Sequence, residues 1–251
     1  MMQKTNIKPI IEVKDLHKSY GTNHVLDGFH LDLYEGENLV VMGKSGSGKS
    51  VMIKCLIGLE QSDSGSIIIM DKNMNDIHRE DLDEIRTEVG FLFQGSALYD
   101  SMSVRENLEF PLRRHTKKFG IIEDTTPLVM EALENVGLAN TINLMPNELS
   151  GGMKRRIALA RTLILKPKII LYDEPTTGLD PITSKEIIML MKSIQEKYKT
   201  SSIIITHDID CARVIANRMI LLIDGINYAQ GTFAELSASK DPKIEAFFFF
   251  F

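Results

Sequence analysis

The chain has 251 residues, of which 43% are hydrophobic and 25% charged, so it can form one large domain with a real core. Its net charge of −5 gives no sign of a nucleic-acid surface, and we expect no nucleic-acid partner. No apolar run approaches the roughly 20 residues that cross a bilayer, and no signal region is evident. We therefore expect a cytoplasmic protein. Cys55 and Cys211 fit no disulfide or metal spacing, which predicts core positions.

Strands and turns are predicted for the first part of the chain. Over residues 10–42, short apolar runs alternate with turn residues, which predicts antiparallel strands. Within this stretch, Asn38–Met42 is predicted to be a buried strand that leads into a glycine-rich loop. A helix is expected at Ser50–Leu59, because its apolar residues share one face. Further strands are expected at Ile67–Met70 and Val89–Phe93.

The rest of the chain alternates predicted helices and strands. The expected helices are Val104–Leu112, Pro127–Val136, Ser150–Lys166 and Thr183–Lys199, and the expected buried strands are Ile169–Tyr172, Ser202–Thr206 and Arg218–Ile223. This alternation is typical of an α/β fold with a parallel sheet at its core. We expect a single domain over residues 1–251, with a helical subdomain inserted at about residues 95–165.

The glycine-rich loop fits the phosphate-binding pattern G-x-x-x-x-G-K-[ST]. Its residues are Gly43, Lys44, Ser45, Gly46, Ser47, Gly48, Lys49 and Ser50, and we expect Val51 to belong to the same nucleotide-binding group. Backbone N–H groups of such a loop surround phosphate oxygens at the positive end of the following helix. Lys49 would reach the β- and γ-phosphates of ATP, and the Ser50 hydroxyl would bind Mg²⁺. A chance glycine-rich turn is the alternative, but a strand before and a helix after favour the phosphate loop.

Other candidate site residues stand at strand or helix ends. Asp173 ends a buried strand, where phosphate-loop ATPases carry a Mg²⁺ ligand, and Glu174 is the candidate catalytic base. A solvated pair of acids is the alternative. Ser150 is a good N-cap, and Gly151 and Gly152 leave N–H groups open to an anion, although a plain capped helix would look the same.

In their order and spacing, these motifs resemble those of an ATP-binding-cassette (ABC) ATPase over about residues 10–235. The resemblance implies a RecA-like phosphate-loop core with a parallel sheet, an antiparallel β subdomain and the inserted helices. It also implies that Gln94 joins Mg²⁺ and the attacking water to the transporter-facing surface. His207 would hydrogen-bond the γ-phosphate, and Tyr20 would stack on adenine. Each of these three could instead be an ordinary strand-end or surface residue.

The resemblance further implies how the chain assembles. The loop of Ser150, Gly151 and Gly152 would contact the γ-phosphate held by a second copy, so we expect a homodimer joined through ATP. Met153 departs from the family's usual glutamine, which leaves the backbone contacts intact. Gln94–Leu112 would contact an integral-membrane permease, which would place the chain on the inner face of the cell membrane.

Four segments are similar to one branch, the ATPase of the Mla lipid-transport system. They are Phe91–Tyr99, Glu109–Arg113, Leu144–Glu148 and Asp180–Thr183. This resemblance implies phospholipid transport with a permease and an Mce-type lipid-binding protein. An ATPase subunit of a different importer, or a soluble ABC protein without a transport role, are the alternatives. The run Phe247–Phe251 has no interpretation from sequence.

Overall fold

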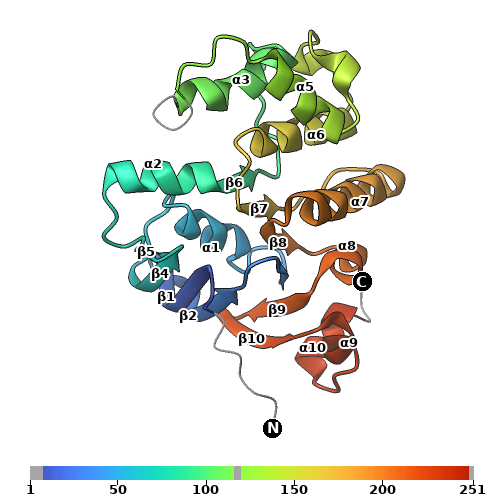
Figure 1. Cartoon of the computed structure of the whole chain (residues 1–251). Helices are drawn as coiled ribbons and strands as arrows, with labels where there is room; N and C mark the ends of the chain where they lie inside the picture. The colour runs from blue at the N-terminus through green and yellow to red at the C-terminus, as the bar shows by residue number, and fades with distance from the viewer. Residues whose placement is uncertain (1–7, 116–119, 249–251) are drawn as a thin grey trace. The chain divides into compact units, whose positions relative to one another are not determined.

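The computed structural model describes residues 8–115 and 120–248. The chain divides into two compact units (Figure 1). We call Met1–Ile85 with Ser201–Phe251 the phosphate-loop unit, and Arg86–Thr200 the central unit. None of the helices that the structure describes combines the length and the apolar character that crossing a membrane requires.

The phosphate-loop unit contains an antiparallel sheet in the order β2-β1-β4-β5. Its strands are β1 (Ile11–Tyr20), β2 (Asn23–Leu33), β4 (Ser64–Ile69) and β5 (Lys72–Asn73). β1 and β2 form a hairpin across Gly21, whose φ of 60° suits a tight turn. The antiparallel strands predicted over residues 10–42 are confirmed for β1 and β2.

The same unit holds four further strands, adjacent in the order β10-β9-β3-β8. They are β3 (Asn38–Met42), β8 (Ser201–Thr206), β9 (Arg218–Ile223) and β10 (Ile226–Gly231). β3 runs parallel to β8 and β9, so the expectation of antiparallel strands is wrong for the end of the 10–42 stretch. The reason is that β3 is buried throughout, which is typical of a parallel sheet covered on both faces. Met42 pairs with Thr206, so the loop at Gly43 and the side chain of His207 leave the sheet at one edge.

Within the described residues, five helices contribute to this unit. They are α1 (Lys49–Leu56), α8 (Ile209–Ile215), α9 (Phe233–Ser237), α10 (Pro242–Phe248) and most of α2 (Arg79–Glu88). Phe247 is buried in α10 and Phe248 contacts the ring of Phe233, so the first two residues of the phenylalanine run are helical; the other three lie outside the described residues. Cys55 and Cys211 both lie buried in the core, as predicted, and burial raises the pKa of the Cys55 thiol to about 11.

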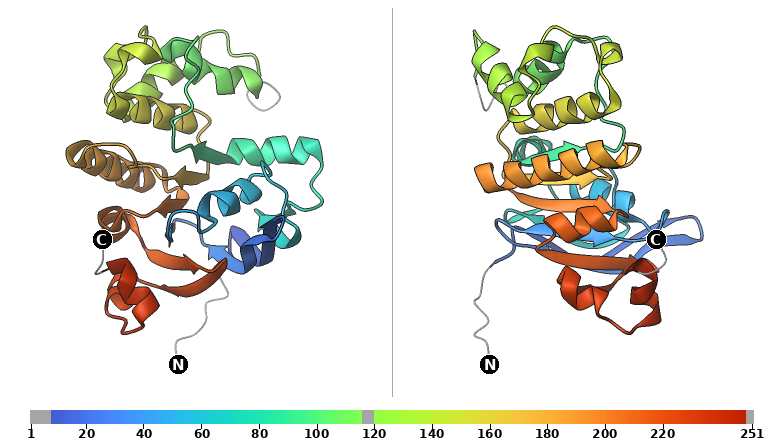
Figure 2. Two further views of the ribbon diagram at one scale, coloured as in Figure 1. Left: turned by 180° about the vertical axis from the view of Figure 1, so that it is seen from behind. Right: turned by 90° about the vertical axis from the view of Figure 1, so that its right-hand side faces the viewer.

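In the central unit, two parallel strands are combined with a group of helices. The elements are β6 (Val89–Leu92), α3 (Val104–Arg114), α5 (Thr126–Asn135), the 3-10 turns η1 (Ala139–Thr141) and η2 (Pro146–Glu148), α6 (Gly151–Leu163), β7 (Ile169–Asp173) and α7 (Pro181–Tyr198). α3, α5 and α6 pack against one another (Figure 2). Leu92 pairs with Tyr172, so the segments that carry Gln94 and Glu174 leave at the same edge.

Candidate active site

The loop Gly43–Gly48 between β3 and α1 has a shape that only glycine permits at several positions. Gly46 and Gly48 adopt φ values of 78° and 98°. A Cβ atom at Gly48 would lie 2.7 Å from the carbonyl oxygen of Val25, and one at Gly43 would lie 2.8 Å from that of Leu222. The backbone therefore approaches its neighbours closely and turns back toward the start of α1.

Two side chains, one in this loop and one at the start of α1, fit a bound anion. The Lys49 ammonium is buried and donates to the carbonyl oxygens of Gly43 and Lys44, at 2.7 and 2.9 Å. The Ser47 hydroxyl is buried and has no hydrogen-bond partner among the described residues. Buried polar groups are normally hydrogen-bonded, so an orphaned hydroxyl in a loop whose carbonyl groups contact a buried cation fits a site for phosphate oxygens.

His207 follows β8 and is exposed at the edge from which the phosphate loop emerges. The turn around it is fixed, because Asp208 N donates to Thr206 Oγ1 at 3.0 Å and the Asp208 carboxylate caps α8. The structure therefore brings two of the predicted elements, His207 and the loop, to one edge of one unit.

A cavity of about 770 Å³ adjoins the phosphate loop. It is lined by residues 44–47 of the loop, 23–25 and 27 of β2, 222–225 of the β9–β10 turn and 242, 243, 246 and 247 of α10. Two contacts fix α10 there: Lys243 Nζ lies 3.0 Å from Asp224 Oδ2, and the Tyr228 hydroxyl donates to Asp241 Oδ2 at 2.9 Å. Sequence reasoning missed α10, although Asp241 followed by Pro242 is a helix-start signal.

Tyr20 does not line this cavity in the structure. Its ring is about half exposed, at 48%, and Lys18 Nζ lies 5.1 Å from the ring centroid. Partial burial and a hydrogen bond to Glu60 raise the pKa of the Tyr20 hydroxyl. Val25, five residues later, does line the cavity, and the stacking of Tyr20 on adenine stays a prediction.

The central unit carries the two acids at the end of β7. Asp173 and Glu174 are 6% and 8% exposed. Glu174 has a φ of 49°, a left-handed conformation that costs a residue with a Cβ on the order of 1–3 kcal/mol. Thr177 holds it in two ways, since its N–H donates to the Glu174 carbonyl at 3.3 Å and its hydroxyl donates to Glu174 Oε2 at 3.1 Å. The carboxylate is thereby held in a defined orientation.

Two arginines of α6, which the sequence reading did not single out, fix the segment around Gln94. Arg155 donates to the carbonyl oxygens of Phe93 and Thr177, at 2.8 and 3.3 Å. Arg161 donates to those of Ala97 and Ser96, at 2.8 and 3.1 Å. Gln94 itself is exposed. Burial lowers the pKa of Arg155, and the nearby Asp173 carboxylate counteracts this.

The loop predicted to contact a second nucleotide starts α6. Ser150 is the N-cap, and its hydroxyl accepts from Met153 N at 3.2 Å. Ser150 and Gly151 are exposed, so this helix start is open. A Cβ atom at Gly152 would lie 2.6 Å from the Thr183 side chain, so a larger residue here would require Thr183 of α7 to shift.

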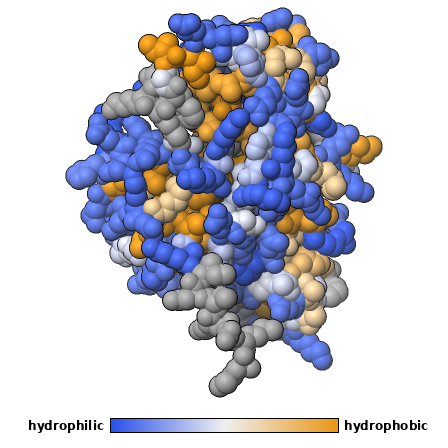
Figure 3. Space-filling model, in the orientation of Figure 1, coloured by the Kyte–Doolittle hydropathy of each residue, from blue (hydrophilic) through white to orange (hydrophobic). Residues whose placement is uncertain are grey.

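The segment predicted to face a permease is fixed by one buried amide. Asn107 is fully buried; its Nδ2 donates to the carbonyl oxygens of Tyr99, Met102 and Ser103, and its Oδ1 accepts from Tyr99 N. The rings of Tyr99 and Phe110 remain partly exposed and contact each other at a centroid distance of 4.9 Å. Figure 3 shows apolar side chains gathered over the helices of the central unit.

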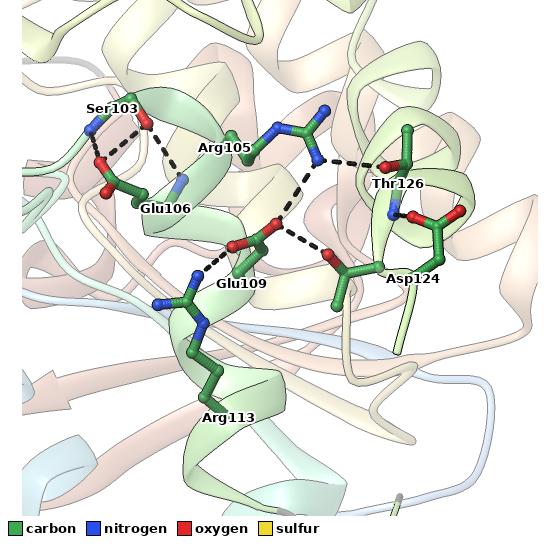
Figure 4. A network of polar contacts seen from close by, with 8 residues as sticks. Ser103, Arg105, Glu106, Glu109, Arg113, Asp124 and Thr126 are labelled. Atoms are coloured by element: carbon green, nitrogen blue, oxygen red, sulfur yellow. Dashed lines mark hydrogen bonds and ion pairs between the residues drawn. The ribbon is translucent and has the colours of Figure 1, made fainter. Parts of the chain in front are cut away.

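A polar network holds α3 to the start of α5 (Figure 4). The buried Glu109 carboxylate accepts from Thr125 Oγ1 at 2.7 Å and from Arg113 Nη2, and it pairs with Arg105 Nη1 at 3.5 Å. Arg105 also donates to Thr126 Oγ1 at 3.2 Å. These contacts therefore fix α3 to the start of α5.

Comparison with known proteins finds relatives that all belong to one family. Residues 26–177 match the family model described as ABC transporter. The methionine import ATP-binding protein MetN of Clostridium tetani is 41% identical over 216 residues, which are 86% of this chain and 67% of the relative. The probable ribonucleotide transport ATP-binding protein mkl of Mycobacterium leprae is 40% identical over 94% of this chain and 68% of its own length.

Solved structures agree with this result. A dimeric post-hydrolysis structure of the ATP-binding cassette MJ0796, bound to ADP and Pi, matches with a TM-score of 0.80 and 34% identity over 89% of this chain and 98% of its own. The protein cbiO1 of Clostridium perfringens, part of the ABC transporter complex cbiONQ, matches with a TM-score of 0.83 and 29% identity over 95% of this chain and 94% of its own. The expected α/β cassette fold is thus confirmed. The chain belongs to the ABC transporter family, as an ATPase cassette that binds ATP with Mg²⁺.

Proposed function

We propose that this chain is the energy-coupling subunit of a transporter that moves phospholipid across a bacterial envelope. One observation carries the proposal: Phe91–Tyr99 and Glu109–Arg113, which resemble the Mla ATPase, lie in or beside the exposed face around Tyr99 and Phe110. Two of the four segments that resemble the lipid-transport branch thus lie at a face that is suited to contact a partner. On this proposal the chain lies on the inner face of the membrane, bound to a permease that works with an Mce-type protein.

For hydrolysis, we propose distinct roles for the two units. Lys49 would exchange the loop carbonyls that it now contacts for β- and γ-phosphate oxygens, and His207 would donate to the γ-phosphate. Glu174 would accept the proton of the attacking water, which Gln94 would orient. Ser50, Asp173 and Gln94 supply oxygen ligands of the kind Mg²⁺ prefers, and the ion would neutralise phosphate charge. Residues 43–51 would hold the phosphates, and the nucleoside would occupy the cavity beside Val25 and α10.

We further propose that two copies share each ATP. The open start of α6 at Ser150, Gly151 and Gly152 supports this, because exposed N–H groups at a helix start attract an anion. The cassette MJ0796 has been solved as a dimer. Mixing a Lys49→Ala chain with a Ser150→Arg chain tests the idea, since one of the two composite sites in the mixed dimer carries neither lesion. Hydrolysis above that of either variant alone is expected; full hydrolysis by wild-type monomers at high dilution would overturn the proposal.

The transport assignment is tested by copurification. Wild-type protein, expressed with its neighbouring membrane subunits, should retain a permease and bound phospholipid. Tyr99→Asp with Phe110→Asp should lose the permease, because the exposed rings would become charged. Met189→Asp, at an exposed apolar residue of α7, is the matched control and should keep it.

A different importer is the second candidate, because the relatives include proteins named for methionine import and ribonucleotide transport. Stimulation of ATP hydrolysis by a small solute and its binding protein, with no lipid in the purified complex, would favour this candidate. Stimulation by phospholipid alone would favour the first.

A further inference from the structure

We propose that Arg155 is a positioning residue for ATP hydrolysis, which holds the backbone around Gln94 and Glu174 in the arrangement that hydrolysis needs. The inference rests on the proposed role of Glu174 as catalytic base. Arg155 lies on α6, about one helical turn after Ser150. Its guanidinium donates two hydrogen bonds, and neither of them goes to Asp173 or Glu174. It acts through the carbonyl oxygens of Phe93 and Thr177.

Both carbonyl groups lie close to groups that would handle the attacking water. Phe93 immediately precedes Gln94, and Thr177 is the residue whose hydroxyl donates to Glu174 Oε2 at 3.1 Å. Two hydrogen bonds, one to the Thr177 backbone and one from its side chain, therefore connect Arg155 to the carboxylate. A movement of α6 at this turn would be transmitted to the base.

The conformation of Glu174 explains why the hydrogen bonds from Arg155 and Thr177 would be needed. Its φ of 49° is unfavourable for a residue with a Cβ, so surrounding contacts must maintain it. Fixing the Thr177 carbonyl limits how far the loop can relax toward an ordinary conformation. Catalytic groups lose much of their effect when they move by about 1 Å, so such fixation is worth a large factor in rate.

Stability alone does not explain a guanidinium at this position. Arg155 is 4% exposed, and its Nε group has no partner among the described residues. Burying a charge is costly, and replacing buried ionic groups by apolar residues of similar volume is often neutral or stabilising. An incompletely paired buried cation beside Asp173 is better explained by what it positions.

Three variants of the full-length protein test the inference by steady-state kinetics. Arg155→Met keeps most of the volume but removes the donors, and we expect kcat to fall about 10- to 100-fold while KM for MgATP changes little. Arg155→Lys keeps the charge and one donor group, so it should recover part of the rate. Thr177→Val removes the hydroxyl from an isosteric side chain and should lower kcat about tenfold.

Arg156→Met is the matched control, because the adjacent Arg156 contacts Glu186 and the Val136 carbonyl instead of these loops. It should keep kcat near the wild-type value. Unchanged kcat in Arg155→Met, or an equal loss in Arg156→Met, would overturn the inference. Failure of the base assignment is distinguishable, since Glu174→Gln would then remain active; an inactive Glu174→Gln beside a normal Arg155→Met removes the inference alone.

Discussion

The phosphate-loop unit and the central unit place their functional groups by different means. In the first, backbone shape does the positioning: a Cβ atom at Gly43 or Gly48 would come within 2.8 Å of a carbonyl oxygen. In the second, side chains from α3 and α6 hold the backbone of the loops through hydrogen bonds, as Asn107, Arg155 and Arg161 do. The conformation of the phosphate loop thus depends on the missing Cβ atoms of its glycines. The loops of the central unit depend on hydrogen-bond donors from residues that are distant in the sequence.

From this difference we expect the glycine-rich loop to be rigid and the loops of the central unit to be adjustable. Glycine positions in close backbone contact leave little room for change, which suits the proposed phosphate site, since it would bind the same phosphates in every cycle. Hydrogen bonds from side chains can re-form when helices shift, which suits the loops that we propose to contact a partner. Variants in the two units should therefore fail in different ways.

The largest effect is expected from Glu174→Gln, in the central unit. The amide has nearly the same shape but cannot accept a proton from water, and general-base contributions are about 10²–10⁴-fold. We expect kcat to fall by that factor while MgATP still binds, measured by steady-state hydrolysis and by titration with a fluorescent ATP analogue. Glu131→Gln, at an exposed ion pair with Lys166, is the control and should be unaffected. Normal turnover in Glu174→Gln would refute the assignment.

Lys49→Ala should fail in the opposite way, through affinity. Hydrogen bonds to charged groups contribute about 1.5–3 kcal/mol, so the loss of this ammonium should weaken MgATP binding about 10- to 100-fold. Lys54→Ala removes the same charge from an exposed position of α1 and is the control. Equilibrium binding measures both, and undiminished affinity in Lys49→Ala would contradict the phosphate-loop assignment.

The same contrast explains what the sequence could predict. Buried strands such as Asn38–Met42 and Arg218–Ile223 were predicted with the observed bounds, because continuous apolar runs are typical of parallel sheets. The glycine-rich loop after β3 could be predicted because steric needs fix its glycine spacing, and its binding of phosphate stays a prediction. The proposed role of Arg155 could not be predicted from the sequence, because it depends on carbonyl groups that are 62 and 22 residues away in the chain.

Other features escaped prediction for related reasons. The helix α2 has only Leu82 and Ile85 as apolar residues among its charges, so its apolar face is too short to be recognised in the sequence. The contacts of Tyr20 depend on Lys18 and Glu60, and no local pattern shows which way an exposed ring turns. In α10, a run of phenylalanines obscured a helix that borders the cavity.

Asn107→Ala should sharpen the comparison by weakening only the central unit. The substitution removes one acceptor and several donor contacts to Tyr99, Met102 and Ser103 from a fully buried site. We expect the free energy of unfolding to fall by about 1–2 kcal/mol, with water replacing part of the loss, and MgATP affinity to stay unchanged. Chemical denaturation measures the first quantity. Asn135→Ala, which loses contacts at a partly buried site of the same unit, should cost less.

The smallest effect is expected from Ala246→Trp, on the cavity side of α10. If the nucleoside occupies the cavity, the indole ring takes part of its space and MgATP affinity should fall about three- to tenfold, or about 0.7–1.4 kcal/mol. Magnesium tripolyphosphate has no nucleoside, so its affinity for the phosphate loop should stay the same. Ala238→Trp, at an exposed position after α9 and outside the cavity lining, is the control for the added ring. Equal weakening of both ligands would show that α10 acts on the loop itself, and unchanged affinity for both would place the nucleoside elsewhere, with Tyr20 as the next residue to test.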